Sequence, residues 1–498
     1  MKIQISETTI IDFINGLLND KIKLLEKVNA GNNSNVRISS IYTDNKNILN
    51  KISTISYITL RGNNKIIEIG FDGVQSEEKA TALIIETQEL IQPFMKRFLI
   101  FCDSKWRDLP TCHLLKKELE NRYKNSIVLI VNFLDAENIV KYFSPTAIFI
   151  PHVNGNRNKN IAKLVRASGG FVFVLPTEGR PHKLEGAEWL TANSDYFDLF
   201  FSWCDLPNKL KNELGDKFHI VGCGRFNLNK LKITDKTTFC TNHNVNPDNP
   251  IVLFNSSFPA AKFALKNLAF HLHDMEDLGA KKINGDPELD AVNSYDRFLR
   301  FQTWITETRL NFPKITFMVK PHPMEDISLW ERFCLTNNII LIKGDFVYNP
   351  INAADVIISQ VGCVTHQDAW LQNKPSIHLD LNTPKTDFIS ETEKYGYGIA
   401  DDPALLSKML QQCLLEEEYN SNKDKEILNQ YGFTIQDSSS KILDIVDEYL
   451  ATMPQSNSEF NLPKTFELIR NVDKNVPTID WLGHYNKLIT QKDVIEFE

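Results

Sequence analysis

The chain lacks the features that mark secreted and metal-centred proteins. It has eight cysteines, and no two of them form a Cys-X-X-Cys pair. Most lie within apolar runs, as at Phe101-Cys102, so in a chain of 498 residues they predict reduced thiols in a cytoplasmic protein. The closest histidines, His271 and His273, are two residues apart and point to different sides of a helix. We therefore expect neither a disulfide framework nor a bound metal.

Long uncharged apolar runs are also missing. The first apolar stretch, from Ile10 to Leu18, is interrupted by Asp12 and Asn15, so it lacks the apolar core of a signal peptide. No run approaches the roughly 20 residues that span a bilayer. The sequence therefore predicts a cytoplasmic protein without a transmembrane segment, and it leaves open a peripheral position at the inner face of the cell membrane.

The chain has no excess of positive charge and no low-complexity segment. It carries 63 acidic residues against 55 lysines and arginines, a net charge of −8, which disfavours a dedicated nucleic-acid binder. Its 21 glycines and 21 prolines are too few for a collagen-like or low-complexity chain. The length and the 42% of hydrophobic residues predict a globular protein of two or three domains.

Short apolar strands alternate with helical patterns over most of the chain. The predicted strands lie at 98–101, 127–131, 147–150, 171–175 and 218–222, and then at 251–254, 315–319, 339–342, 356–358 and 376–379. This alternation indicates an α/β fold with parallel sheets that helices cover on both faces. Two such Rossmann-like blocks would face each other across a cleft, where the carboxyl ends of both sheets meet a ligand.

The same patterns set the expected domain boundaries. They predict a small α+β module at 1–96, Rossmann-like domains at 97–234 and 251–450, a polar linker at 235–250, and a helical tail at 451–498. Within the first module we expect helices near 10–18 and 77–91 and a hairpin of 56–60 with 66–69. This module is either a structural cap or a unit for self-association or acceptor binding.

Three strand ends in the second block carry residues suited to a phosphate. These residues are Asn255, Ser256 and Ser257, then Lys320, His322 and Pro323, then Ser359, Gly362 and Thr365. Small residues at a helix N-terminus expose N–H groups, and lysine and histidine donate to phosphate oxygens. Each feature alone also fits an ordinary turn or helix cap. Together they predict a nucleotide or phosphate site, with Asp368 as a candidate for the ribose hydroxyls.

The first block contributes charged residues to the same cleft. The strand at 171–175 leads into Glu178, Gly179 and Arg180, and a carboxylate on such a loop is placed to act as a general base. Arg107 and Asp108 follow the first strand, and Arg225 follows the last. The alternative roles are a turn or helix cap for the acids and a structural salt bridge for the arginines.

These motifs resemble GT-B glycosyltransferases of bacterial surface-carbohydrate biosynthesis. The likeness covers about residues 97 to 450 and is strongest to the surface carbohydrate biosynthesis proteins, with broader similarity to capsule Kdo transferases and bacterial sialyltransferases. The motifs that carry it are Lys105–Leu109, Glu178-Gly179, Gly222–Phe226, Leu253–Phe258, Lys320–Pro323 and Ala354–Pro375.

The resemblance implies a role for each matched residue. His322 with Ser359 or Thr365 would hold the donor phosphate, and Glu178 would be the catalytic acid or base. In the sialyltransferases the base lies in an acidic-acidic-glycine motif, and here Thr177 stands in the first acidic position. The first Rossmann-like domain would bind the acceptor and the second the nucleotide sugar, in a transfer that needs neither a metal ion nor another cofactor.

The leading hypothesis is therefore a glycosyltransferase that takes a sugar from a nucleotide, such as a CMP-linked acid sugar, and extends a capsule polysaccharide or lipopolysaccharide. A polyol-phosphate transferase or a sugar-nucleotide epimerase on the same fold is the alternative among enzymes. A non-catalytic nucleotide-sugar-binding subunit is the alternative outside them. The expected partners are the donor and a glycan or glycolipid acceptor, with a homo-oligomer left open.

Overall fold

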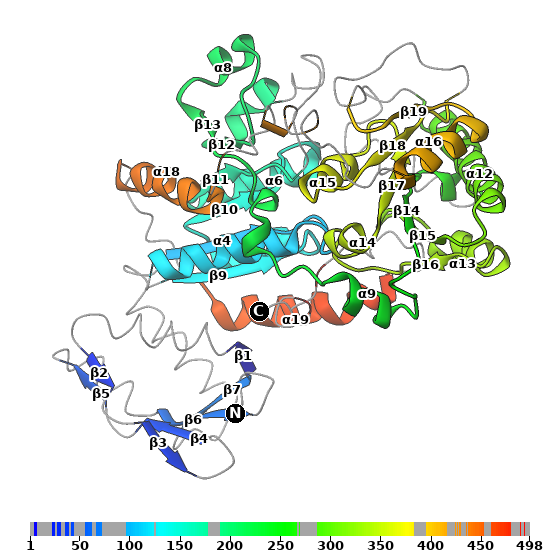
Figure 1. Ribbon diagram of the computed structural model, residues 1–498. Helices are drawn as coiled ribbons and strands as arrows, with labels where there is room; N and C mark the ends of the chain where they lie inside the picture. Colours follow the sequence, from blue (N-terminus) through cyan, green and yellow to red (C-terminus); the bar gives the residue numbers. More distant parts are fainter. Residues whose placement is uncertain are drawn as a thin grey trace.

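The computed structural model describes short strands within residues 4–71 and most of the chain from 96 to 479. Beyond the first strands, the described ranges are 96–123, 126–177, 190–265, 286–382, 395–415, 437–452 and 460–479, with a few single residues between and after them. Two sheets lie side by side (Figure 1). Within these ranges, no helix combines the length and the apolar character that a bilayer crossing requires.

The first sheet has six strands, and every neighbouring pair is parallel. In spatial order they are β13 (Phe218–Ile220), β12 (Leu199–Ser202), β11 (Phe171–Val174), β10 (Ala147–Ile150), β8 (Lys96–Phe101) and β9 (Ser126–Val131). Five of them were predicted, and the four-residue strand β12 was missed. Within this sheet β8 comes first in the chain, β9 is added on one side of it, and β10 to β13 are added on the other. The connections therefore leave β8 in opposite directions, which opens a crevice at the carboxyl edge beside it.

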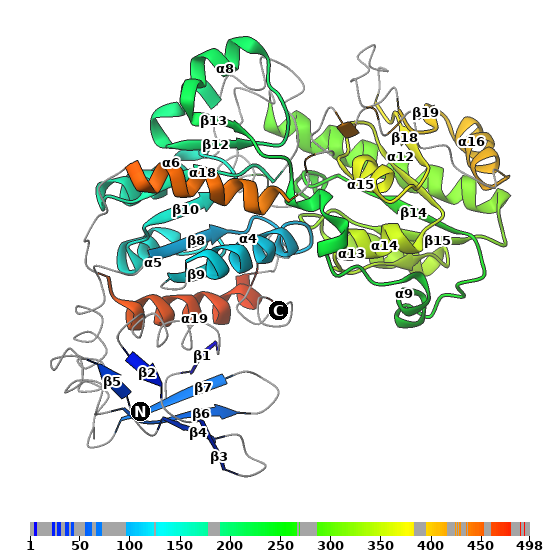
Figure 2. The same cartoon turned by 60° about the vertical axis from the view of Figure 1, so that its left-hand side comes forward.

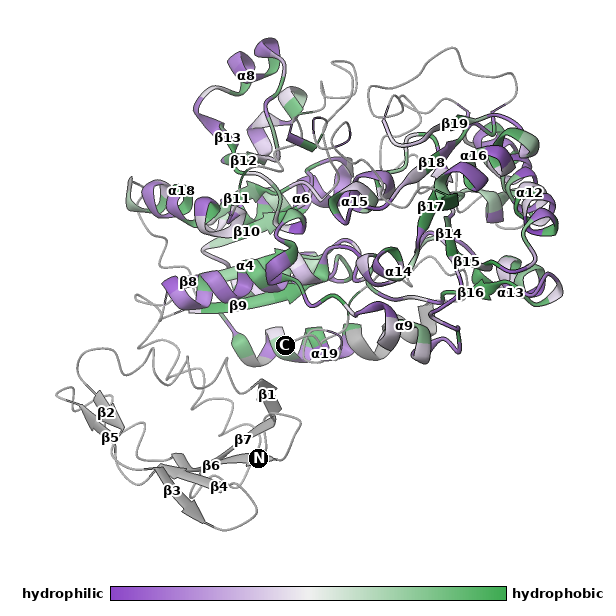
Figure 3. Ribbon diagram, viewed as in Figure 1, coloured by the Kyte–Doolittle hydropathy of each residue, from purple (hydrophilic) through white to green (hydrophobic). Residues whose placement is uncertain are grey.

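Alternate residues of the strands pack into two different cores. Leu99 and Phe101 join a cluster on one face, whereas Phe98 and Ile100 join a cluster on the other. The first face is covered by α5 (Ala136–Phe143), α6 (Gly155–Ala167), α8 (Asn208–Leu214) and α19 (Leu462–Ile479), and the second by α4 (Leu109–Arg122) and α18 (Ser438–Thr452). Figure 3 shows these hydrophobic strands between helices of mixed character.

The second sheet repeats the same plan. Its six parallel strands are, in spatial order, β16 (Ile340–Leu341), β15 (Thr316–Lys320), β14 (Ile251–Asn255), β17 (Val356–Gln360), β18 (Ser376–Leu379) and β19 (Gly398–Ala400). One face is covered by α12 (Pro287–Asn311), α13 (Ile327–Thr336) and α16 (Pro403–Leu415), and the other by α9 (Lys236–Asn242), α14 (Tyr348–Ala353) and α15 (Thr365–Leu371). Here the order reverses at β14.

The prediction of an α/β fold with two Rossmann-like sheets is confirmed. Because each sheet begins with an inner strand, the loops after β8 and after β14 both lie at a point where the strand order reverses. Figure 2, turned by 60°, shows the second sheet beside the first, with α14 and α15 on the side towards it. This places the motif-bearing strand ends of one domain opposite those of the other.

The C-terminal helices pack on the first sheet although they follow the second in sequence. Leu443 and Val446 of α18 lie in one core of the first sheet, and Leu462 and Ile469 of α19 lie in the other. Figures 1 and 2 both show α18 and α19 against this sheet. Residues 438–450, which the sequence grouped with the second domain, thus complete the core of the first.

The predicted linker takes part in the second core. Helix α9 forms within it, and Asp235 caps the helix by accepting a hydrogen bond from the Thr238 N–H. Phe239 and Cys240 are buried beside β14 and β15. The segment therefore connects the domains and also covers one face of the second sheet.

Strands of the N-terminal region form an antiparallel sheet and a separate pair. The sheet has the order β1 (Gln4–Ser6), β7 (Ile66–Phe71), β6 (Ile55–Arg61), β4 (Asn35–Ile38), β3 (Lys27–Ala30), and β2 (Ile22–Leu24) pairs with β5 (Ile41–Thr43). β6 and β7 pair antiparallel, which confirms the predicted hairpin. The helices predicted near 10–18 and 77–91 lie outside the described residues.

Candidate functional site

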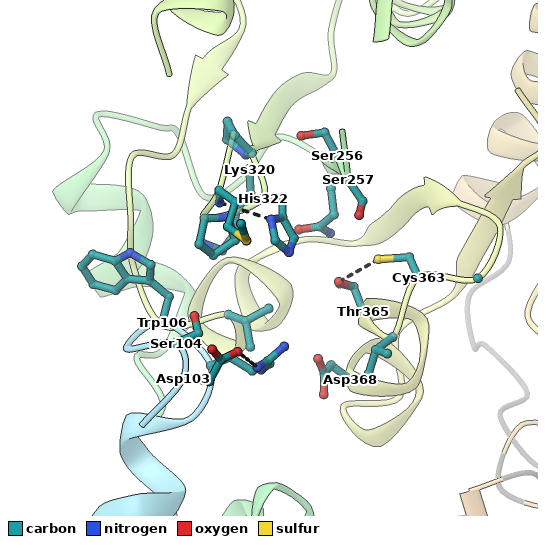
Figure 4. Close-up of a pocket in the computed structure, with 18 of the residues that line it drawn as sticks. Asp103, Ser104, Trp106, Ser256, Ser257, Lys320, His322, Cys363, Thr365 and Asp368 are labelled. Atoms are coloured by element: carbon teal, nitrogen blue, oxygen red, sulfur yellow. Dashed lines mark hydrogen bonds and ion pairs between the residues drawn. The ribbon is translucent and has the colours of Figure 1, made fainter. Parts of the chain in front are cut away.

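A cavity of about 270 Å³ lies between the two sheets, at the carboxyl ends of their central strands. The first domain lines it with the loop after β8 and with Arg225, and the second with the strand ends of β14, β15 and β17 (Figure 4). Eleven of the predicted residues reach this wall: Arg107, Arg225, Asn255, Ser256, Ser257, Lys320, His322, Pro323, Gly362, Thr365 and Asp368. The volume is near the lower end for small-ligand pockets, about 300 Å³.

A buried carboxylate fastens the loops after β14 and β15 to each other. Glu325 accepts hydrogen bonds from the Ser256 hydroxyl at 2.8 Å, from the Phe258 N–H at 2.7 Å and from the Trp330 indole N–H at 2.6 Å. Its fourth donor is the His322 N–H, at 3.4 Å. Burial raises the pKa of Glu325, while these donors lower it. The arrangement sets the separation of the serine loop from the histidine loop.

The imidazole of His322 is oriented by its own loop. The Met324 N–H donates to His322 Nδ1 at 3.2 Å, so a neutral ring carries its proton on Nε2. The buried Lys262 ammonium in turn donates to the Met324 carbonyl at 2.7 Å. In Figure 4 the ring of His322 extends into the cavity towards Ser257. Nε2 is therefore the ring nitrogen that can donate, and the ring lines the cavity.

Lys320 places a buried ammonium group at the cavity. Its Nζ donates to the Asp345 carbonyl at 3.1 Å, and the side chain lines the cavity. Burial lowers the pKa of Lys320 to about 8, and the Asp345 carboxylate opposes that shift. Lys320 is therefore mostly charged at neutral pH. Because burial removes water from this ammonium group, a bound anion would stabilise its charge.

The turn after β17 is open to the cavity, but its helix is short. Gly362 has a φ of +78° and no atom within 4 Å of the position where a Cβ would stand, which suits glycine. The helix that starts at Thr365 has seven residues, so the predicted helix N-terminus contributes little here. Ser359 is fully buried, and its hydroxyl donates to the Asn255 carbonyl at 3.0 Å, outside the cavity wall.

The carboxylate of Asp108 holds the loop after β8 in place through hydrogen bonds. Asp108 accepts from the Ser104 N–H at 3.0 Å and from Arg107 Nε at 2.7 Å, and it is buried behind the cavity wall. Arg107 also donates to Asp103 at 3.1 Å. Asp108 precedes α4 without making a side-chain cap, so the predicted alternative of a helix cap does not apply. Burial raises the pKa of Asp108, and Arg107 opposes this.

Arg225 and Asp368 form a buried ion pair between the two domains. Arg225 Nη2 lies 2.5 Å from Asp368 Oδ2, and both side chains are 3% exposed. The Tyr348 hydroxyl lies 3.0 Å from the Asp368 Oδ1 and 3.0 Å from the Arg225 carbonyl. Burial raises the pKa of Asp368, and Arg225 opposes the rise. The carboxylate predicted for a ribose is thus bonded to Arg225 and Tyr348.

Residues 178–189 lie outside the described part of the chain, and with them Glu178, Gly179 and Arg180. The chain enters this segment from Thr177. The Thr177 hydroxyl accepts from Arg107 at 3.1 Å, and its carbonyl accepts from Arg225 Nη1 at 3.3 Å. Both arginines that hold Thr177 line the cavity.

Sequence reasoning missed several residues of this site. Glu325 stands three positions after His322, a spacing that could have drawn attention to it. Ser104 and Tyr348 carry no such local signal, whereas Trp106 lies within the motif Lys105–Leu109 without having been singled out. The Trp106 carbonyl accepts from the Val347 N–H of the second domain at 3.0 Å. Such contacts between residues far apart in the chain arise only from the packing of the domains.

The chain is similar to solved structures of low sequence identity. No family model matches it, and no curated protein sequence matches it. It is similar to the UDP-GlcNAc 2-epimerase from Neisseria meningitidis bound to UDP-GlcNAc, with 16% identity and a TM-score of 0.45 over 71% of this chain and 100% of that one.

A polymerase and a glycosyltransferase are among the other similar structures. The wall teichoic acid polymerase TagF has 11% identity and a TM-score of 0.46 over 74% of this chain and 93% of that one. A glycosyltransferase from Rickettsia africae has 12% identity and a TM-score of 0.38 over 72% and 99%. At such identities and scores a shared chemistry does not follow from the likeness, because one fold hosts many activities.

Proposed function

We propose that the chain is a glycosyltransferase that moves a sugar from a nucleotide-activated donor, a CMP-linked acid sugar, to a surface polysaccharide or lipopolysaccharide. The observation that carries this is the cavity between the two sheets, where Lys320 and His322 lie opposite Arg107 and Arg225. Such donors suit the phosphate of a nucleotide sugar. The carboxyl edges of two Rossmann-like sheets are also where α/β proteins bind such ligands.

In this proposal the second domain, built on the sheet from β14 to β19, holds the donor. Lys320 and His322 bind the phosphate, with Asn255, Ser257 and Thr365 as further donors along the same wall. Ser256, Pro323, Gly362 and Ser359 shape the loops that present them. Asp368 acts through Arg225, with which it is paired, instead of binding the ribose directly.

The first domain, at 97–234, holds the acceptor, and Glu178 is the proposed base. The acceptor hydroxyl attacks the anomeric carbon, its proton passes to Glu178, and the bond from that carbon to the phosphate oxygen breaks. The electron pair leaves with the nucleotide, whose growing charge Lys320 and His322 stabilise. We propose that this charge takes the place of a metal ion, and that the enzyme works in the cytoplasm at the inner face of the membrane.

The test combines binding with product analysis. A thermal-shift series with CMP, CDP, UDP and GDP identifies the nucleotide, since a ligand at 100 times its Kd adds about 2.7 kcal/mol to stability. Incubation with the matching nucleotide sugars then separates transfer or slow hydrolysis, which release the nucleotide, from epimerisation, which retains it. Release that stops in EDTA would contradict the metal-free proposal.

The matched variant is His322→Ala, with His219→Ala as its control on strand β13 outside the cavity. We expect His322→Ala to lower the turnover by about 100-fold, the scale of losing a transition-state donor, with unchanged thermal stability. The control should keep the wild-type turnover. Equal turnover in both variants would overturn the assignment of His322.

A further inference from the structure

Two residues late in the chain, Ile489 and Asp493, lie against the first domain beside the cavity. Ile489 is 1% exposed, in the core cluster that also contains Cys102, the residue just before the loop after β8. Asn132 Nδ2, at the end of β9, donates to the Ile489 carbonyl at 2.8 Å. Asp493 Oδ1 lies 3.4 Å from Nζ of Lys105, which belongs to the loop itself. We call Ile489 and Asp493 the brace.

Asn132 is oriented so that it holds the brace. It is 4% exposed, and its Oδ1 accepts from the Leu134 N–H at 2.8 Å while its Nδ2 donates to Ile489. Because one end of the amide faces an N–H and the other a carbonyl, only this orientation satisfies both. The Cys102 N–H donates to the carbonyl of Val131, the residue before Asn132, at 2.9 Å. Ile489 is therefore bound at the carboxyl edge of the sheet, where the loop after β8 begins.

Lys105 carries the contact onward from the brace to the second domain. Its Nζ lies 4.6 Å from the centre of the Trp106 ring, so the ammonium group is shared between this ring and Asp493. The Trp106 carbonyl accepts from the Val347 N–H of the second domain at 3.0 Å. A Cβ on Gly344 would come within 2.7 Å of the Trp106 ring. The brace, the loop after β8 and the second domain are thus in continuous contact.

The loop that the brace contacts forms part of the cavity wall. Trp106 lines the cavity from the first domain, next to Asp103 and Ser104, and Val347 lines it from the second (Figure 4). A shift of the loop therefore moves the wall that a ligand contacts. The brace is held by one buried isoleucine, a hydrogen bond between neutral groups and a partly exposed ion pair, each modest beside the stability of a whole domain. It can thus detach while the rest of the domain stays folded.

We propose that the brace regulates ligand binding in the cavity. While Ile489 and Asp493 are docked, the loop after β8 is held against the second domain and the cavity wall is complete. When they detach, the loop gains freedom, and a ligand binds more weakly because it must order the loop first. This rests on the proposed function in taking a nucleotide as that ligand. Linkage requires the reverse effect as well, so that a bound nucleotide keeps the brace docked by the same factor.

Two variants of the full chain detach the brace in different ways. Asn132→Asp keeps the acceptor for the Leu134 N–H and places an oxygen opposite the Ile489 carbonyl, where the two oxygens repel each other. Ile489→Ala removes the buried side chain and leaves this hydrogen bond in place. Because the two changes act through different groups, an effect on the loop that both share follows from detachment of the brace.

Leu450→Ala is the matched control. Leu450 is 3% exposed in the same core cluster as Ile489, so its truncation removes a similar amount of packing. It lies near the end of α18, and its neighbour Tyr449 packs on Phe171, the first residue of β11. The control therefore weakens the cluster at the amino edge of the sheet, away from the loop after β8.

Hydrogen exchange measures the freedom of the loop, and calorimetry measures ligand binding. Exchange is followed in peptides of 103–108 and 343–347 and in peptides that contain Ile489, with and without saturating CMP or UDP. Titration calorimetry gives the affinity for CMP, UDP and pyrophosphate. Thermal melting checks that each variant folds.

We expect Asn132→Asp and Ile489→Ala to speed up exchange in 103–108 several-fold and to weaken nucleotide binding about tenfold, whereas Leu450→Ala changes neither. In the wild type, a saturating nucleotide should slow exchange around Ile489. Wild-type nucleotide affinity in both folded variants, or an equal loss in Leu450→Ala, overturns the regulation by the brace and keeps the proposed function. Pyrophosphate binding that both variants weaken, in a protein that binds no nucleotide, keeps the brace and overturns the function.

Discussion

Lys320 shows at the scale of one residue how burial tunes a ligand site. An ammonium group removed from water loses its hydration, so burial lowers the pKa of Lys320 from the ordinary lysine value of 10.5 to about 8. A bound anion would restore part of that stabilisation. The residue therefore contributes most to anion binding when it is protonated, and its charge is lost just above neutral pH.

This predicts a pH dependence for Lys320. Below about pH 8 the amine is charged and anion affinity is at its plateau. Above it, the free protein must take up a proton in order to bind, so the affinity falls by up to tenfold per pH unit. Calorimetry with pyrophosphate at pH 7, 8 and 9 measures this fall. Lys320→Met should bind weakly with no such slope, and a flat wild-type profile would contradict the role.

Glu325 acts at the same scale through hydrogen bonds alone. Four donors point at its two oxygens, and two of them are the backbone N–H groups of Phe258 and His322. Glutamine has one oxygen and one NH2 group, so Glu325→Gln must leave at least one N–H without an acceptor. The loops that carry Ser256 and His322 would then separate.

We predict that Glu325→Gln lowers the free energy of unfolding by about 1–3 kcal/mol and raises the Kd for nucleotide several-fold. Urea unfolding and calorimetry measure the two effects. Glu331→Gln is the control, since Glu331 is half exposed in an ion pair with Lys343 and should change stability by less than about 1 kcal/mol. Unchanged nucleotide affinity in Glu325→Gln would show that the loops do not depend on it.

At the scale of elements, helix α18 completes a core from which it is distant in sequence. Its buried side chains lie in the cluster that contains Phe98 and Ile100 of β8, and α4 lies beside it. The predicted domain boundary at 450 followed the order of the chain. The hydrophobic face of α18 instead packs where an uncovered face of the first sheet is available.

The prediction at this scale concerns Leu443, which is fully buried in that cluster. Leu443→Ala should destabilise the first domain by about 2–5 kcal/mol, because it leaves a cavity against the sheet. Hydrogen exchange should then speed up in peptides of 96–131 and stay unchanged in peptides of 251–260. Leu415→Ala is the control, at a leucine that is 74% exposed. Faster exchange confined to the second sheet would contradict the packing.

At the scale of the whole molecule, the ion pair of Arg225 with Asp368 connects the two domains. The pair is buried, and the Tyr348 hydroxyl lies 3.0 Å from the Asp368 carboxylate and 3.0 Å from the Arg225 carbonyl, so its single proton is shared between two acceptors. Removing one partner of such a pair leaves the other charge buried without compensation, at a cost of about 3–5 kcal/mol. The protein can escape that cost by separating the domains, which returns Arg225 to water.

We therefore predict that Asp368→Asn opens the molecule. Small-angle X-ray scattering should show a larger radius of gyration, and a saturating nucleotide should reverse part of the change. Asp437→Asn is the matched control, because Asp437 pairs with Lys230 at the surface, where its side chain is 49% exposed. A radius equal to that of the wild type would mean that other contacts hold the domains together.

Much of the fold could be predicted because its signals are local. Runs such as Ile127–Val131 are apolar at every position, which is the pattern of a parallel strand covered on both faces, and nearly all of these strands were found. The strands β12 and β19 were missed, although β10 and β13 are equally short and were found. In β19 the only large apolar residue is Ile399, which is too weak a pattern to predict a strand. The site residues that follow β14, β15 and β17 were also predicted. Parallel strands end at the same edge of a sheet, so residues just after them are expected to lie close together.

The sequence alone thus determined the two parallel sheets, the hairpin and the polar strand ends, each of which depends on residues adjacent in the chain. Only the tertiary structure decided that Asp368 pairs with Arg225, that Glu325 joins two loops, and that α18 belongs to the first core. These contacts join residues far apart in sequence or depend on how the loops fold against each other. Their energy comes from burial and desolvation, which exist only once the domains have packed.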